Sequence, residues 1–390
     1  MAQSVPACFG GGKRRCYNLR DLRSRPSGVA VGLYRHPGTG RLASSQNHNL
    51  PVSAPGRRAP FRRVLEIAVS VGFLVLALRG IRVEELWNAL RHASYGWLVP
   101  GVVATAAALA IKAWRWQMLF RPEYHPKFGA VFTALSAGYL ASNVLPARLG
   151  EVVSVVLLVG DEPVSIARAL STLIVMRLLD LLTLLAILIG LLPFVRLPVE
   201  MTRAAQGLGV AALAASALIV FLSFHRDALL DLAQRFFRRV RLLDRPGIYA
   251  GLGHLLDGFA ALRRRSGLGL VGVTLLWWAT VVSAAWAGAQ AFRLEVPLTA
   301  IIFANIVVAL GMLVPSSPGY VGVFHYLVIV ALTPFGVPKE LALGYAIIWH
   351  GMNYLTLSAT GVIALAAHGI SLSQILRYRP EQRSDGLPTQ

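Results

Sequence analysis

Charged residues are scarce in this sequence. Only 14% of its 390 residues are Asp, Glu, Lys or Arg, whereas hydrophobic residues make up 55% and the mean hydropathy is +0.59. Soluble domains carry about 25% charged residues, so this chain has too little polar surface to face water on all sides. Several apolar windows approach the ~20 residues that cross a bilayer core; the clearest are Leu98–Ile111, Leu170–Leu192, Gly207–Phe224, Leu268–Phe292 and Leu341–Ala367. The composition indicates an all-α polytopic membrane protein.

The sequence has few cysteines, and it lacks an early apolar run and a nucleotide-binding loop. The two cysteines, Cys8 and Cys16, are too few for a zinc site or a disulfide framework. Residues 1–60 are rich in Gly, Pro, Ser and Arg and lack the apolar run of a signal peptide. They are predicted to be a basic disordered cytoplasmic tail, or upstream sequence included by a wrong start codon. No GxxxxGK[ST] occurs, so any driving force is expected to be a gradient, or none.

The charges that are present are mostly positive. The net charge is +20, from 38 Lys and Arg against 18 Asp and Glu. The basic residues lie between apolar spans and at both termini, which is the pattern of loops facing anionic lipid and not of a nucleic-acid groove. The sequence therefore indicates a membrane partner and no nucleic acid. It places both termini, including a short tail at 369–390, in the cytoplasm, and we expect a bacterial plasma (inner) membrane.

The loop charges also predict a topology. Basic residues at 57–63 and 226–265 mark the inside, as do those at and after the end of the span Tyr95–Ala113, namely Lys112, Arg115, Arg121 and Lys127. Phe128–Val159 then leaves the inside and returns to it, and Thr299–Phe335 leaves the outside and returns to it. The transmembrane domain, 61–368, is predicted to have about six full spans and two Pro/Gly-broken re-entrant hairpins, arranged as an inverted repeat. Two full crossings within Phe128–Val159 are the alternative.

The first break, NVLPARLGE, gathers polar and helix-breaking residues at membrane depth. Pro146 removes a backbone donor and Gly150 permits close approach. Arg148 offers a guanidinium fork that fits a phosphate, and the freed amides of a helix N-terminus favour an anion. Glu151 would balance Arg148, accept from a substrate amine or carry a proton. Asn143 would cap a helix or line the cavity.

Other polar residues within the apolar spans complete the candidate site. Arg177 and Asp180 lie three residues apart on one helix face, either in the site or as an intrahelical ion pair. An ionisable group at the centre of a span costs roughly 2.5–3.5 kcal/mol, so these side chains must pair or face water. The candidates in the second half are Ser316, Ser317, Pro318, Gly319, Gly322, His325, His350 and Asn353. Each histidine also fits a packing role.

Three separated motifs carry a family resemblance. SNVLPARLGEVVSVVLL, ALSTLIVMRLLDLLTLL and LVPSSPGYVGVFHY resemble the lysylphosphatidylglycerol synthase transmembrane, or flippase-like, family over 64–367. The resemblance implies a membrane domain that moves an anionic or modified lipid between leaflets. Its signature positions here are Asn143, Pro146, Arg148, Gly150, Glu151, Arg177, Asp180 and the Pro318, Gly319 and Gly322 of a PGG-x-G element. Tyr320 replaces the second glycine, and His325 stands where an acidic residue often follows.

The expected function is translocation of an anionic or modified phospholipid, or of a lipid-linked precursor, through a polar cavity between the hairpins. No cofactor, metal or catalytic residue is expected, and no lipid aminoacylation, since no synthase domain follows Ala367. One alternative is an accessory or scaffold subunit of an envelope-lipid pathway. Another is a lipid-modifying enzyme that uses Glu151, His325 and His350. The partners would be the lipid, the membrane and either a second copy or a lipid-synthesis enzyme.

Overall fold

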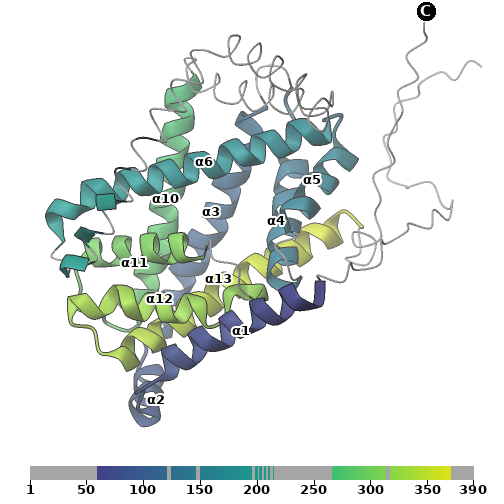
Figure 1. Ribbon diagram of the computed structural model, residues 1–390. Helices are drawn as coiled ribbons and strands as arrows, with labels where there is room; N and C mark the ends of the chain where they lie inside the picture. Colours follow the sequence, from purple (N-terminus) through teal and green to yellow (C-terminus); the bar gives the residue numbers. More distant parts are fainter. Residues whose placement is uncertain are drawn as a thin grey trace, which may run out of the picture. The chain divides into compact units, whose positions relative to one another are not determined.

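The computed structural model describes residues 59–120, 124–145, 150–195, 266–312 and 317–369, with a few more positions between 198 and 214. All of them lie in the unit formed by Leu50–Gln390. Over these residues the regular elements are helices without a strand, which confirms the all-α prediction (Figure 1). The first half contains α1 (Ala59–Leu78), α2 (Val83–Arg91), η1 (Tyr95–Trp97), α3 (Leu98–Met118), α4 (Phe128–Val144), α5 (Gly150–Asp161), α6 (Ile166–Leu191) and η3 (Leu192–Phe194).

The second half repeats the order of a long helix, a broken pair and a long helix. Its elements are α10 (Ser266–Ala291), α11 (Leu298–Gly311), η4 (Pro318–Tyr320), α12 (Val323–Leu332), η5 (Thr333–Phe335) and α13 (Lys339–Ala367). Both breaks lie where the sequence predicts them. Leu145 has extended backbone, with φ −95° and ψ 142°, which is the conformation favoured before a proline. Pro146 and Arg148 themselves lie outside the described residues, as does Ser316.

Four helical stretches among the described residues are long and apolar enough to cross a membrane. They are Tyr95–Met118, Ile166–Phe194, Gly267–Ala291 and Pro318–Phe335, and the shorter apolar helices are Ile67–Leu78, Phe128–Val144 and Leu298–Gly311. The helix α13 has 29 residues but is not one of the four. Its middle carries polar side chains, among them His350 and Asn353, which lower its mean hydropathy. The predicted number of about six full spans stays a prediction.

Two apolar cores hold the helices together. The first lies among α3, α4, α5 and α6 and includes the fully buried Trp116 and Leu158. The second lies among α10, α11, α12 and α13 and includes Ile301 and Tyr345. The Tyr345 hydroxyl donates to the Ala285 carbonyl at 3.0 Å, so this polar group costs little when buried. Each core is centred on one half of the chain, and the end of α6 extends the second with Leu184, Leu185, Leu188 and Leu191.

The contacts between helices repeat in the two halves of the chain. If α3, α4, α5 and α6 are matched with α10, α11, α12 and α13, each contact in one half has a counterpart in the other. Within the halves, α3 packs on α4 as α10 packs on α11, α4 on α5 as α11 on α12, and α5 on α6 as α12 on α13. Between the halves, α13 packs on α4 as α6 packs on α11, and α3 and α10 pack on each other. In Figure 1 the end of α13 accordingly lies beside α4, and α6 lies beside α11.

Candidate functional site

The end of α4 is fastened to α13 at Asn143. The Asn143 side-chain nitrogen donates to the Ser358 hydroxyl at 2.9 Å and to the Tyr354 carbonyl at 3.4 Å. In return, the Tyr354 hydroxyl donates to the Asn143 carbonyl at 3.3 Å. Tyr354 therefore satisfies a carbonyl in the last turn of α4, while the Asn143 side chain ties this helix end to α13.

Gly150 opens α5 and lets it approach α4 closely. A Cβ at Gly150 would collide with the Gly138 carbonyl and the Ser142 hydroxyl, and a Cβ at Gly138 would lie 2.7 Å from the Gly150 carbonyl oxygen. Small residues on both helices are what such a close crossing in a membrane requires. Gly150 thus acts through packing at the first break.

The second break depends on left-handed backbone. Gly319 and Gly322 have φ of +71° and +88°, and Tyr320 has φ of +56°. Tyr320 therefore keeps the conformation that a glycine would favour at this point of the PGG-x-G element, at a cost of about 1 kcal/mol or more. The Ser317 amide donates to the Ser70 hydroxyl of α1 at 2.8 Å. A Cβ at Gly322 would collide with the carbonyl of the same serine, so α1 supports this break.

The two breaks meet at Gly319. A Cβ on this glycine would lie 3.0 Å from the Tyr354 ring and 3.8 Å from the Asn143 carbonyl. Pro318, Gly319 and Tyr320 form η4, which packs against α4. The structure thus brings residues of both predicted hairpins to one place on α13.

The two histidines lie together but have partners within the protein. Their ring centroids are 5.1 Å apart, and His350 stacks on Phe324 at 4.6 Å. The Gly322 amide donates to His325 Nδ1 at 3.4 Å. This bond satisfies one of the amides that have no backbone partner at the start of a helix, here α12. Asn353 points elsewhere, since its side-chain oxygen accepts from the Thr105 hydroxyl of α3 at 3.2 Å. The packing interpretation of these residues therefore fits the contacts best.

The charged residues of α6 pair with other helices. Arg177 binds Glu151 of α5, with Nη2 and Nε at 2.6 Å and 2.9 Å from Oε1. Asp180 instead faces α3, where Lys112 Nζ lies 3.3 Å from Oδ2 and Arg115 Nη2 lies 2.5 Å from Oδ1. The expected intrahelical ion pair between Arg177 and Asp180 is therefore not formed, and each residue pairs with another helix. Each residue has an opposite charge within contact distance on a neighbouring helix.

The two pairings differ in exposure. The side chains of Arg177 and Glu151 are 58% and 50% exposed, whereas those of Lys112, Arg115 and Asp180 are 4%, 0% and 13% exposed. Arg177 and Asp180 are three residues apart on α6, so the exposed pair lies one helical turn from the buried group. Together these five residues form a polar strip that leads from the surface of the helices to their interior. We refer to them as the charged strip.

The span was expected to end at Ala113, with Lys112 and Arg115 at its inside end, and the burial of both side chains was not foreseen. The helix α3 continues to Met118, and both side chains are buried. Trp277 of α10 lies under both cations, 4.3 Å from Lys112 Nζ and 5.0 Å from the Arg115 guanidinium carbon. This contact stabilises a desolvated cation by ~2 kcal/mol. The available signal was the run IKAWRW, in which two cations lie three residues apart next to two tryptophans.

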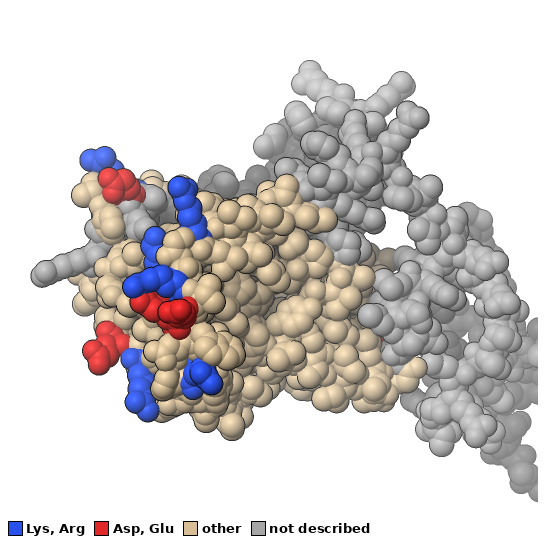
Figure 2. All heavy atoms as spheres, turned by 90° about the horizontal axis from the view of Figure 1, so that it is seen from below, with Lys and Arg blue, Asp and Glu red and all other residues tan. Residues whose placement is uncertain are grey.

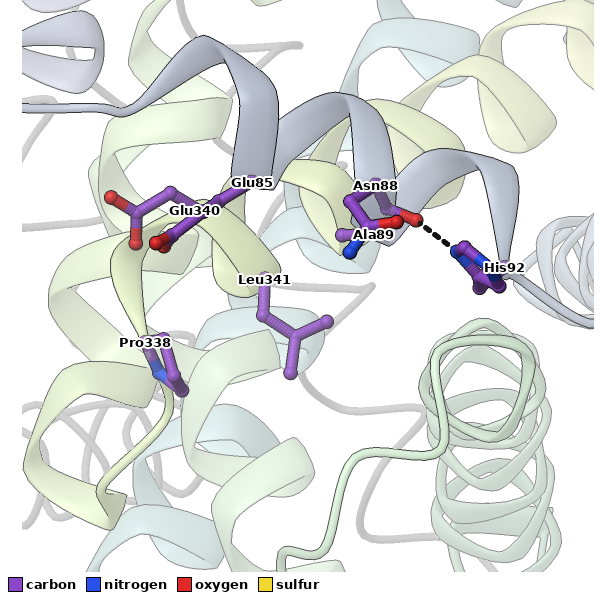
Figure 3. A pocket seen from close by; sticks show the side chains of 7 residues that line it. All are labelled: Glu85, Asn88, Ala89, His92, Pro338, Glu340 and Leu341. Atoms are coloured by element: carbon purple, nitrogen blue, oxygen red, sulfur yellow. Dashed lines mark hydrogen bonds between the residues drawn. The ribbon is translucent and has the colours of Figure 1, made fainter.

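A shallow groove between α2 and α13 lies apart from the charged strip. Its volume is about 290 Å³, and it is lined by Glu85, Asn88, Ala89, His92, Pro338, Glu340 and Leu341 (Figure 3). Glu340 accepts from the Arg82 amide at 3.3 Å. Hydrogen bonds from its own amide and that of Arg82, with the charges of Arg82 and Lys339, lower the pKa of Glu340. None of the predicted site residues lines this groove.

Charged side chains cluster on one face of the described residues. In the view from below, side chains of both signs gather over one part of the visible face, and the rest of its coloured atoms are uncharged (Figure 2). The helix α2, which lies at the bottom of Figure 1, carries exposed Glu84, Glu85 and Arg91. A second polar contact joins the α3–α4 connection to the end of α5, where the Tyr124 hydroxyl donates to Glu162. Burial and that carboxylate raise the pKa of Tyr124 to about 12. Such polar groups suit helix ends at a membrane surface.

Comparisons with known proteins give one match. No curated protein and no solved structure matches this chain. The family model described as the lysylphosphatidylglycerol synthase TM region matches residues 63–361. That range contains the charged strip and both breaks, and with the apolar helices it indicates an integral membrane protein of lipid metabolism or transport. The chain belongs to the lysylphosphatidylglycerol synthase transmembrane-region family.

Proposed function

We propose that this protein translocates an anionic or modified phospholipid, or a lipid-linked precursor, between the leaflets of a bacterial plasma membrane. The observation that carries the proposal is the Glu151–Arg177 pair, whose side chains are half-exposed although Arg177 lies in the middle of an apolar helix. Arg177 follows the start of α6 at Ile166 by eleven residues, or about 17 Å along the axis. That is roughly half of the ~30 Å hydrocarbon core.

An exposed ion pair at this depth needs water or a polar ligand. Ionisable side chains within spans face a bundle interior or a water-filled cavity, since lipid tails cannot solvate them. The charged strip offers an anionic headgroup a path between α3, α5 and α6, while the acyl or isoprenoid tails stay in the bilayer. Arg177, Lys112 and Arg115 would attract the phosphate, and Glu151 and Asp180 would hold these cations when no lipid is bound.

The helix lengths support re-entrant hairpins on both sides of this path. The arms α4, α5, α11 and α12 have 17, 12, 14 and 10 residues, or roughly 26, 18, 21 and 15 Å. Alone, α5, α11 and α12 are too short to cross, although α12 together with η4 and η5, Pro318–Phe335, reaches the length of a span. Non-helical backbone at membrane depth is stable only against protein or a polar cavity. The matched helix contacts support an inverted repeat, with both termini in the cytoplasm. Such repeats place a transport site at their interface.

Leaflet exchange in liposomes tests the proposal. Purified protein is reconstituted with fluorescent phosphatidylglycerol, and dithionite quenches only the label in the outer leaflet. We expect quenching beyond the outer half for the wild type, and a large loss of exchange for the double variant Glu151→Gln with Arg177→Gln. Arg79→Gln, on an exposed turn outside the charged strip, is the control for lost positive charge. Unchanged exchange in the double variant would contradict a path along these residues. A double variant that loses exchange but retains the activity of the lipid pathway would favour the scaffold role.

A further inference from the structure

The buried end of the charged strip contains more positive than negative charge. Lys112 and Arg115 are 4% and 0% exposed, and the carboxylate they contact is that of Asp180. Glu151, the other carboxylate of the strip, is already bound to Arg177. Among the residues that the structure describes, one positive charge thus stays uncompensated where water does not reach, and buried charges in proteins are normally paired. Trp277 offers its ring face to both cations, which reduces the imbalance without supplying a negative charge.

The Arg115 guanidinium also has unused hydrogen-bond donors. Nη2 lies 2.5 Å from Asp180 Oδ1 as an ion pair, yet Nε, Nη1 and Nη2 have no hydrogen-bond partner among the described residues. The great majority of buried donor groups in proteins have a hydrogen-bond partner, so a buried donor without one calls for an explanation. A guanidinium presents five N–H groups in a rigid fork. Here the fork is fully buried and charged, and its Nε and Nη1 donors remain available to an anion with several oxygens.

We propose that Arg115, assisted by Lys112, binds a phosphate group inside the protein, beside the carboxylate of Asp180. The inference rests on the proposed function and adds to it the residues that receive the headgroup. Phosphate fits because its oxygens match the fork bidentately, and the ammonium of Lys112 adds a point charge beside it. The phosphate comes from the outer end of the strip, one helical turn away at Arg177. It supplies the negative charge that the buried group lacks.

Thermal stability of the full-length protein in detergent tests the site without measuring transport. The probes are phosphatidylglycerol, galactosyl diacylglycerol, which has neither phosphate nor charge, and inorganic phosphate. We expect phosphatidylglycerol to raise the melting temperature of the wild type and of Arg79→Gln, and the galactolipid to leave it unchanged. In Arg115→Gln the apparent affinity for phosphatidylglycerol falls about 10- to 100-fold, as expected for lost hydrogen bonds to a charged group. This variant keeps Lys112 and Asp180 as a balanced pair, so it is expected to fold.

The outcomes separate the site from the transport function. Equal stabilisation of Arg115→Gln and the wild type by phosphatidylglycerol overturns the site, whatever the exchange assay shows. Arg115-dependent stabilisation in a protein without leaflet exchange supports the site and removes translocation. A response to inorganic phosphate as well assigns recognition to the phosphate alone, whereas a response to the lipid only assigns it to the headgroup. If Arg115→Gln does not fold, Arg115→Lys decides, since it keeps the charge and loses the fork: weaker binding supports the proposal and equal binding overturns it.

Discussion

Asp180 is the residue on which the buried charges depend. Its two oxygens face Lys112 and Arg115 of α3, so it is the contact that allows two cations to remain beneath the surface. Removing one partner of a buried ion pair leaves a charge uncompensated and costs about 3–5 kcal/mol. Removing one of two cations leaves a neutral pair. The order of stability among variants therefore reports which charges are needed for folding.

We predict that Asp180→Asn lowers the free energy of unfolding by about 3–5 kcal/mol, because both cations lose their carboxylate. Arg115→Gln should lower it much less, since Lys112 still balances Asp180. Thermal unfolding of the two purified variants in one detergent, without anionic lipid, measures the difference. Equal losses in both variants would mean that Arg115 is mainly a structural partner of Asp180.

Glu340 supplies a prediction about pH. Its pKa lies below the usual 4.5, owing to amide hydrogen bonds and to Arg82 and Lys339. A lowered carboxylate pKa stabilises the fold above the unfolded value and loses this effect as the pH falls through the folded value. The wild type should therefore melt above Glu340→Gln at neutral pH, and the gap should close as the pH falls below 4.5. A gap that is independent of pH would contradict an ionised Glu340 at the start of α13.

Among the elements, the crossing of α4 and α5 has the tightest steric requirement. Gly138 and Gly150 face each other's carbonyl oxygens, so neither position has room for a methyl group. Gly190 of α6, in contrast, has nothing within 4 Å of where its Cβ would lie. Gly138 and Gly190 both lie within helices, α4 and α6, but only Gly138 is crowded. The two positions therefore make a matched pair for substitution.

We predict that Gly138→Ala destabilises the protein by on the order of 1–3 kcal/mol, because the Gly150 carbonyl must move. Gly190→Ala should stabilise it by about 0.5–1 kcal/mol through the higher helix propensity of alanine. Thermal unfolding of both variants checks the pair. A gain in stability for Gly138→Ala would show that α4 and α5 are not so close.

The helices themselves were largely predictable. Leu268–Phe292 was expected from its apolar run, and the helix is Ser266–Ala291; the first break was expected at Pro146, and α4 ends at Val144. Length, hydropathy and helix-breaking residues are local, so they are visible in one sequence. The partners of the charges were not, because Arg115 meets Asp180 and Trp277 only through packing of distant helices. A basic residue near a helix end looks like a loop residue until its neighbours are known.

At the scale of the whole molecule, the topology remains a prediction with a direct test. The first hairpin is expected to begin and end in the cytoplasm, so a cysteine at Val144, which is 51% exposed, should react with a charged thiol reagent supplied from that side. Native Cys16 in the predicted cytoplasmic tail is the inside control. Trp87→Cys is the outside control, because α2 lies between a first span that is predicted to leave the cytoplasm and a second that returns to it. Labelling of Val144→Cys from the outside alone would contradict the re-entrant hairpin.

The central claim is that the charged strip conducts a lipid headgroup across the membrane. The measurement that tests it most directly is dithionite-monitored exchange of fluorescent phosphatidylglycerol in liposomes that contain wild-type protein, Arg115→Gln or Arg79→Gln. Both substitutions remove one positive charge, but only Arg115 belongs to the strip. We predict exchange for the wild type and Arg79→Gln, and a rate for Arg115→Gln close to that of protein-free liposomes. Equal rates for all three proteins would contradict the account.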